Sequence, residues 1–239
     1  MARYFIAQLI DHTLLGANTT EADIKKLCIE AQRHQFAAVC TTSFWTSYSA
    51  SLLKDSSVKV ASVVGFPFGA QPIEVKLEEA RHCIRYGAHE LDVVLNIGSF
   101  LSGDESYVQQ ELAEIGRICR KQTPTVVVKA ILETAYLSPE QIDRLVYLAA
   151  EAKTPFLKTS TGFGPRGASL EDMAHLQTAI AKYSTTPHDL QIKASGGIRT
   201  HAELTRFIEA GATRIGTSAG ISIMQELAGQ EPASLGGEL

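Results

Sequence analysis

The sequence predicts a single (β/α)8 barrel that occupies the whole chain, residues 1–239. Eight apolar runs suited to buried strands alternate with segments of helical periodicity, at spacings of about 23–36 residues. The length of 239 residues is close to the ~250 residues typical of this fold. An open doubly wound sheet is the alternative, but a dinucleotide-binding sheet would carry GxGxxG after its first strand, and this chain does not.

The predicted strands are short apolar runs, at 7–13, 36–42, 58–65, 89–96, 125–132, 155–160, 190–195 and 213–217. Predicted helices lie between them, at 20–34, 46–54, 72–86, 105–121, 139–152, 169–182 and 201–210. Ser138-Pro139-Glu140-Gln141 combines an N-cap serine, a proline at the first helical position and a capping-box glutamine, and Thr200 with Glu203 repeats the box. Gly87 and Gly211 stand where helix C-terminal caps are expected. Residues from about 229 to 239 are predicted to form a loose tail.

Composition excludes several classes of function. The net charge is −4, from 22 basic and 26 acidic residues, so neither nucleic acid nor an anionic membrane is an expected partner. No apolar run approaches the 18 or so residues that would span a bilayer. The four cysteines, Cys28, Cys40, Cys83 and Cys119, are widely spaced without a CxxC pair, which predicts reduced thiols in a cytoplasmic protein and no zinc site.

Three lysines occupy matching places in successive strands: Lys129 in TVVVKAILE, Lys158 in PFLKTSTGFG and Lys193 in LQIKASGGIR. Inward residues at the C-terminal ends of barrel strands form the active site, and neighbouring strands lie about 4.8 Å apart. Two amines within roughly 5 Å repel by about 3 kcal/mol at an effective dielectric constant near 20, or roughly two pKa units. Desolvation acts in the same direction. We therefore expect one lysine with a pKa of about 7–8 to attack carbonyls, although this reasoning does not decide which.

Asp92, in HELDVVLN, is the predicted proton-transfer residue beside these lysines. Forming a Schiff base requires loss of water from a carbinolamine, and cleaving a neighbouring C–C bond requires removal of a hydroxyl proton. A carboxylate can serve both steps, directly or through water. The alternative is a buried ion pair that merely neutralises a lysine, and the presence of three lysines favours the catalytic interpretation.

Two glycine-rich turns predict a phosphate site. SGGIRT (195–200) follows the seventh strand and RIGTSAG (214–220) follows the eighth, and each opens a helix. Barrels often bind phosphate at these two loops and a helix N-terminus. The candidate ligands are Gly196, Gly197 and Gly216, hydroxyls of Thr217 or Ser218, and an amide of Gly162. Three other residues are interpreted structurally: Arg166 as a solvated loop residue, His12 as facing away from Asp11, and Cys40 as a small buried side chain.

The chain resembles the deoxyribose-phosphate aldolases, class I aldolases with a (β/α)8 barrel. The resemblance rests on IDHTLL, VVGFPFG, ELDVVLN, VKAILET, FLKTSTGFG, IKASGGIRT and RIGTSAG, which occur in family order along nearly the whole chain. It implies that Lys158 forms the Schiff base, that Lys193 lowers its pKa and that Asp92 transfers protons. It further implies phosphate contacts from Gly162, Gly196, Gly197 and Ser218, and substrate contacts from Asp11, Thr13 and Lys129. Two departures are CTTSF at 40–44, where the family often has CVNP, and Phe163, where some members have a lysine.

The implied reaction is reversible cleavage of 2-deoxy-D-ribose 5-phosphate to D-glyceraldehyde 3-phosphate and acetaldehyde, without a metal or organic cofactor. The expected partners are therefore a phosphorylated sugar and acetaldehyde, in a cytoplasmic protein that could assemble as a homodimer or homotetramer. The alternatives are another Schiff-base aldolase of a phosphorylated sugar and a phosphosugar-binding barrel without turnover. An isomerase of phosphorylated metabolites would share the phosphate turns but would not need clustered lysines.

Overall fold

The computed structural model describes residues 2–184 and 189–230. Within these ranges eight parallel strands form a closed barrel in sequence order, which confirms the predicted fold. The strands are β1 Ile10–Thr13, β2 Ala38–Thr41, β3 Lys59–Val64, β4 Glu90–Val94, β5 Val127–Ile131, β6 Phe156–Lys158, β7 Gln191–Ser195 and β8 Arg214–Thr217.

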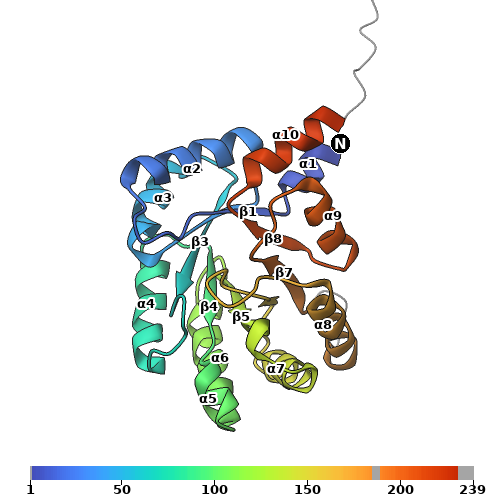
Figure 1. Ribbon diagram of the computed structural model, residues 1–239. Helices are drawn as coiled ribbons and strands as arrows, with labels where there is room; N and C mark the ends of the chain where they lie inside the picture. Colours follow the sequence, from blue (N-terminus) through green and yellow to red (C-terminus); the bar gives the residue numbers. More distant parts are fainter. Residues whose placement is uncertain (1, 185–188, 231–239) are drawn as a thin grey trace, which may run out of the picture.

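Helices surround the strands, and α1 lies beside α10, close to where β1 pairs with β8 and closes the barrel (Figure 1). The α-helices are α1 Ala2–Ala7, α2 Glu21–His34, α3 Thr46–Leu52, α4 Ile73–Arg85, α5 Ile97–Leu101, α6 Glu105–Arg120, α7 Pro139–Glu151, α8 Leu170–Tyr183, α9 His201–Glu209 and α10 Gly220–Gln230. Two 3-10 turns, η1 Ser43–Trp45 and η2 Thr134–Tyr136, follow β2 and β5. None of the helices in the described ranges is long and apolar enough to cross a membrane.

The predicted helix signals are present. Ser138 caps α7 with the full capping box and Pro139 opens the helix, and Thr200 caps α9 in the same way. Gly87 and Gly211 follow α4 and α9 with φ of 97° and 93°, the left-handed conformation that glycine adopts without strain.

Some boundaries differ from those predicted. The first strand begins at Ile10 rather than at 7, because residues 2–7 form α1. Neither α5 nor the two 3-10 turns were predicted, since short helices leave little periodicity in the sequence. The predicted loose tail overlaps the end of α10, which runs to Gln230, and residues 231–239 lie outside the described residues.

The outward and inward faces of the barrel wall carry different kinds of residue. Outward residues such as Val39, Leu157 and Ile215 pack against the helices in a large apolar core. The inward face holds a small apolar cluster, which includes Ala61 and Val63 of β3. Charged residues also point inward from six strands, by strand alternation: Asp11, Glu90, Asp92, Lys129, Lys158, Lys193 and Arg214.

Candidate active site

The three predicted lysines meet at one carboxylate. Lys158 and Lys193 are direct register partners on β6 and β7, and Asp92 is the partner of Lys129 across β4 and β5. Lys158 Nζ donates to Asp92 Oδ2 at 2.8 Å, and Lys193 Nζ donates to the same oxygen at 2.7 Å. Lys129 Nζ donates to the other oxygen, Oδ1, at 2.9 Å. The predicted convergence of the lysines on Asp92 is therefore present in the structure.

Two further carboxylates balance this cluster. Asp11 of β1 accepts hydrogen bonds from Lys193 and from Arg214, whose Nε lies 2.9 Å from Asp11 Oδ1. Glu90 of β4 accepts from Lys129 and from Arg214, with Nη1 to Oε1 at 3.1 Å and Nη2 to Oε2 at 3.0 Å. The lysines thus lie in a network of alternating charges rather than as bare cations.

The network fixes the ionisation of its members. Burial alone would raise the pKa of Asp92, but the three lysines outweigh it and hold this pKa well below its usual value. Burial alone would lower the pKa of Lys193, but Asp11 and Asp92 outweigh it and raise this pKa above its usual value. Asp92 is therefore a carboxylate and Lys193 an ammonium ion at neutral pH.

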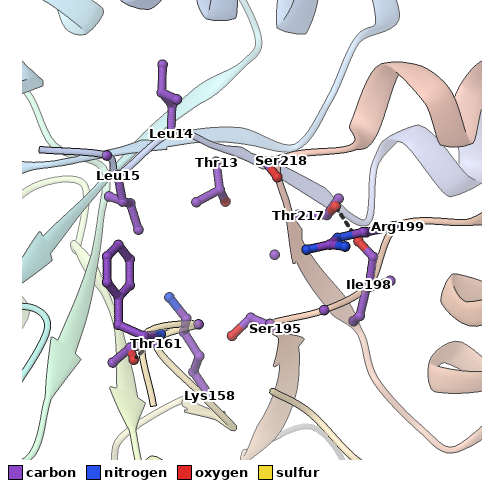
Figure 2. Close-up of a pocket in the computed structure, with 16 residues that line it drawn as sticks. Thr13, Leu14, Leu15, Lys158, Thr161, Ser195, Ile198, Arg199, Thr217 and Ser218 are labelled. Atoms are coloured by element: carbon purple, nitrogen blue, oxygen red, sulfur yellow. Dashed lines mark hydrogen bonds between the residues drawn. The ribbon is translucent and has the colours of Figure 1, made fainter. Parts of the chain in front are cut away.

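A cavity of about 310 Å³ opens above the network at the C-terminal ends of the strands. Figure 2 shows the amine of Lys158 pointing into it, with Thr13 and Ser218 on the opposite side. The other predicted residues that line the cavity are Gly162, Gly196, Gly197, Gly216 and Thr217. Asp11, Asp92, Lys129 and Lys193 are instead fully buried beneath it. The predicted residues therefore form two groups: those in the cavity wall, which a ligand can touch, and a buried charged layer below them.

Comparisons with known proteins agree with this arrangement. The DeoC/LacD family of aldolases matches residues 5–226. The deoxyribose-phosphate aldolase of Carboxydothermus hydrogenoformans is 46% identical over 226 residues, which are 95% of this chain and 96% of that protein. The chain belongs to the DeoC/LacD family of aldolases.

Other members of this aldolase family are similar over nearly their whole length. The deoxyribose-phosphate aldolase of Methanocella arvoryzae is 44% identical over 227 residues, covering 94% of this chain and 96% of that one. The solved structure of the tetrameric deoxyribose phosphate aldolase from Aeropyrum pernix superposes with a TM-score of 0.86 at 32% identity, covering 95% and 93% of the two chains.

Hydrogen bonds connect the glycine-rich turns of this aldolase. Gly196 and Gly197 have φ of 88° and 82°, so two successive residues adopt a conformation that a side chain would strain. Thr217 Oγ1 donates to Ile198 O at 2.6 Å and thereby joins the turns after β8 and β7 (Figure 2). Ser195 Oγ donates to Ser160 O, also at 2.6 Å, and joins β7 to the loop after β6.

The segment after β5 contains a strained residue, at its contact with the loop after β6, that the sequence did not predict. Glu133 has φ of 49°, and its buried carboxylate accepts hydrogen bonds from the backbone N–H and the hydroxyl of Thr161. Thr161 precedes Gly162 in the cavity wall. Left-handed backbone at a glutamate is uncommon, and such strain often marks a functional loop. Nothing in the local sequence distinguishes Glu133 from an ordinary residue at the end of a strand.

The residues given structural interpretations behave largely as predicted. His12 faces outward, with Nε2 2.9 Å from Glu30 Oε2. Cys40 is buried with Sγ 3.7 Å from Asp92 Oδ2, and burial raises the pKa of its thiol to about 11. Arg166 is exposed in its loop, as predicted, and its guanidinium also forms an ion pair with Asp172.

Three further charged residues of the site were not predicted. Arg199, in the IKASGGIRT motif, lines the cavity, and Figure 2 shows its guanidinium beside Thr217. Arg214 and Glu90 complete the charged layer. The signal that could have found them is strand alternation, since Glu90 lies two residues before Asp92 and Arg214 two before Gly216.

Proposed function

We propose that this aldolase reversibly cleaves 2-deoxy-D-ribose 5-phosphate to D-glyceraldehyde 3-phosphate and acetaldehyde through a Schiff base on Lys158. The observation that carries the proposal is the position of one amine. Among the three clustered lysines, which all belong to the described part of the chain, Lys158 alone lines the cavity. Lys129 and Lys193 are completely buried beneath it.

In the proposed reaction the Lys158 amine attacks the C1 aldehyde and forms a carbinolamine, which loses water to give the imine. Removal of the proton from the C3 hydroxyl lets the C2–C3 bond break, and its electrons pass to the imine to form an enamine. Glyceraldehyde 3-phosphate leaves. Protonation at C2 and addition of water then release acetaldehyde and the free amine. Asp92, 2.8 Å from the attacking nitrogen, moves these protons with a water molecule and Lys193.

The rest of the cavity suits the remainder of this substrate. Amides of Gly162, Gly196, Gly197 and Gly216 and the hydroxyl of Ser218 are the proposed phosphate donors. The Arg199 guanidinium supplies a positive charge at the same wall, which compensates for the missing lysine at Phe163. Thr13 is the proposed contact to a substrate hydroxyl, whereas Asp11 and Lys129 act from below through Lys193 and Asp92.

The decisive test is reductive trapping. Incubation with acetaldehyde and borohydride is expected to add one stable two-carbon group, and peptide mapping should place it on Lys158. Cleavage of 2-deoxy-D-ribose 5-phosphate, measured by coupled assay of the triose phosphate, should accompany it. Absence of any adduct on the wild-type protein, or an adduct on another lysine, would remove the proposal.

Replacement of Arg199 by alanine tests the phosphate site. We expect KM for 2-deoxy-D-ribose 5-phosphate to rise about 10- to 100-fold, because a charge-assisted contact of roughly 1.5–3 kcal/mol is lost. The kinetics of unphosphorylated 2-deoxy-D-ribose should change little. Arg166→Ala is the matched control, since Arg166 pairs with Asp172 in the loop after β6. Equal losses for both sugars would contradict a phosphate role.

Replacement of Lys193 by leucine tests the charge coupling. The variant lacks the cation that shares Asp92 Oδ2 with Lys158, so the attacking amine should be protonated up to a higher pH. We expect the acid limb of the pH–rate profile to move upward by about two pH units, with a loss of activity near pH 7 of about 100-fold. An unchanged profile would refute the coupling.

The proposal extends to assembly and location. A tetrameric relative from Aeropyrum pernix superposes on 95% of this chain, which supports a homo-oligomer, either dimer or tetramer. Sedimentation velocity would distinguish these states. A cytoplasmic location is consistent with the cysteines, which all lie in the described residues and are all free and buried.

A further inference from the structure

The inward face of the described strands carries an unequal number of opposite charges. Three carboxylates face four basic groups there, and Lys59, which has the same alternation at the start of β3, is exposed to solvent at the far end of the barrel and is not counted with them. They are Asp11 from β1, Glu90 and Asp92 from β4, Lys129 from β5, Lys158 from β6, Lys193 from β7 and Arg214 from β8.

The remaining groups around Lys158 do not alter this difference. Cys40 on β2 is a neutral thiol, and the inward residues of β3, Ala61 and Val63, are apolar. At the mouth, the Glu133 carboxylate beside Thr161 and the Arg199 guanidinium add one charge of each sign. The interior therefore carries one excess positive charge when every lysine is protonated, and none when Lys158 is a free amine.

We propose that Arg214 and Glu90, which lie farther from the cavity than Gly216 and Asp92 on their strands, are two opposed charges that hold the pH range in which Lys158 can attack a carbonyl, because either charge alone would shift this range and together they cancel. The inference rests on the proposed Schiff-base function. Neither Arg214 nor Glu90 lines the cavity, so both act on Lys158 indirectly, through the charges of the network.

The geometry allows each charge of the pair to be removed separately. Without Arg214, Asp11 keeps its bond to Lys193 and Glu90 keeps its bond to Lys129. Without the Glu90 charge, Arg214 keeps Asp11, and Lys129 keeps Asp92 at 2.9 Å. Neither change leaves an ion without an opposite partner, so the remaining groups retain their charges. Arg214→Met lowers the interior charge by one, and Glu90→Gln raises it by one.

The test measures the pH at which trapping reaches half its maximal rate, using acetaldehyde and cyanoborohydride and quantifying the adduct on Lys158. Less positive surroundings favour the ammonium form, so R214M should move the midpoint to higher pH. E90Q should move it to lower pH. Each shift should be about half a pH unit to one pH unit, and the double variant R214M/E90Q should return close to wild type.

Opposite shifts distinguish this proposal from a loss of packing. Disruption of the barrel would lower the trapping rate in both single variants without moving their midpoints apart. Glu90→Asp and Arg214→Lys keep the charges and should keep the wild-type midpoint. If R214M does not fold, the proposal is tested by comparing the trapping midpoint of E90Q with that of E90D. Unmoved midpoints, or shifts in one common direction, overturn the inference while leaving the Schiff base intact. Failure of the wild type to trap acetaldehyde overturns the proposed function itself.

Discussion

Replacement of Lys158 by alanine is expected to abolish imine formation and to lower kcat for 2-deoxy-D-ribose 5-phosphate by about 10⁴-fold or more. Neither neighbouring lysine can substitute for it. Lys193 and Lys129 are fully buried, and although burial by itself would lower the pKa of each, the surrounding carboxylates outweigh it and raise both values. They therefore remain ammonium ions without access to the substrate.

The measurement combines steady-state kinetics with intact mass after borohydride trapping. Lys158→Arg retains a positive charge at the same place and should be equally inactive, which separates loss of the nucleophile from loss of charge. Lys59→Ala, at the exposed start of β3, is the control and should retain wild-type kinetics and one adduct. A trapped adduct of wild-type yield on Lys158→Ala would show that another amine is the nucleophile.

The second large effect is expected for Asp92→Asn, which keeps the side-chain shape but removes the charge that three lysines share. Loss of the proton-transfer group should lower kcat by about 10²- to 10⁴-fold. Leaving buried ammonium ions without this carboxylate should also lower the free energy of unfolding by about 3–5 kcal/mol. Both effects follow from Nζ–Oδ contacts of 2.7 to 2.9 Å in a fully buried site.

The stability effect has a defined pH dependence. Burial opposes ionisation of Asp92, but the lysines hold its pKa well below the ordinary value. Its contribution to stability is therefore fully present above the unfolded pKa of about 4 and is lost as pH falls through the lower folded value. Urea unfolding at a series of pH values should show the difference between variant and wild type at neutral pH and a smaller difference in acid. Asp55→Asn, at an exposed position, is the control. Wild-type stability of Asp92→Asn at pH 7 would contradict the buried network.

The strand order was predictable because each strand of a barrel buries both faces and leaves a continuous apolar run. Lys129, Lys158 and Lys193 interrupt such runs, so a charge there stands out against its neighbours. Glu90 was hidden, because it stands at the first residue of β4, where a charged residue is ordinary. Arg214 was hidden in the same way at the start of β8, within a motif interpreted as a phosphate turn.

Other parts of the site depend on long-range geometry that no local pattern records. Glu133 combines a left-handed backbone with hydrogen bonds to Thr161, 28 residues later. Arg199 and Arg166 both occupy loops with small residues, but Asp172 binds Arg166, whereas the turn at Gly196 and Gly197 places Arg199 beside the cavity. The pairing of carboxylates with lysines in the interior likewise became visible only with the strand register, which aligns Asp92 with Lys129.

The seam between β4 and β5 separates the interior charges by sign. The anions Asp11, Glu90 and Asp92 belong to the first four strands, and the cations Lys129, Lys158, Lys193 and Arg214 to the last four. A polypeptide cut at this seam would give two half-barrels of opposite interior charge, each unable to exclude water from its own ions. The two half-barrels should attract one another through these charges. The water-free centre of the molecule therefore forms only when both half-barrels have come together.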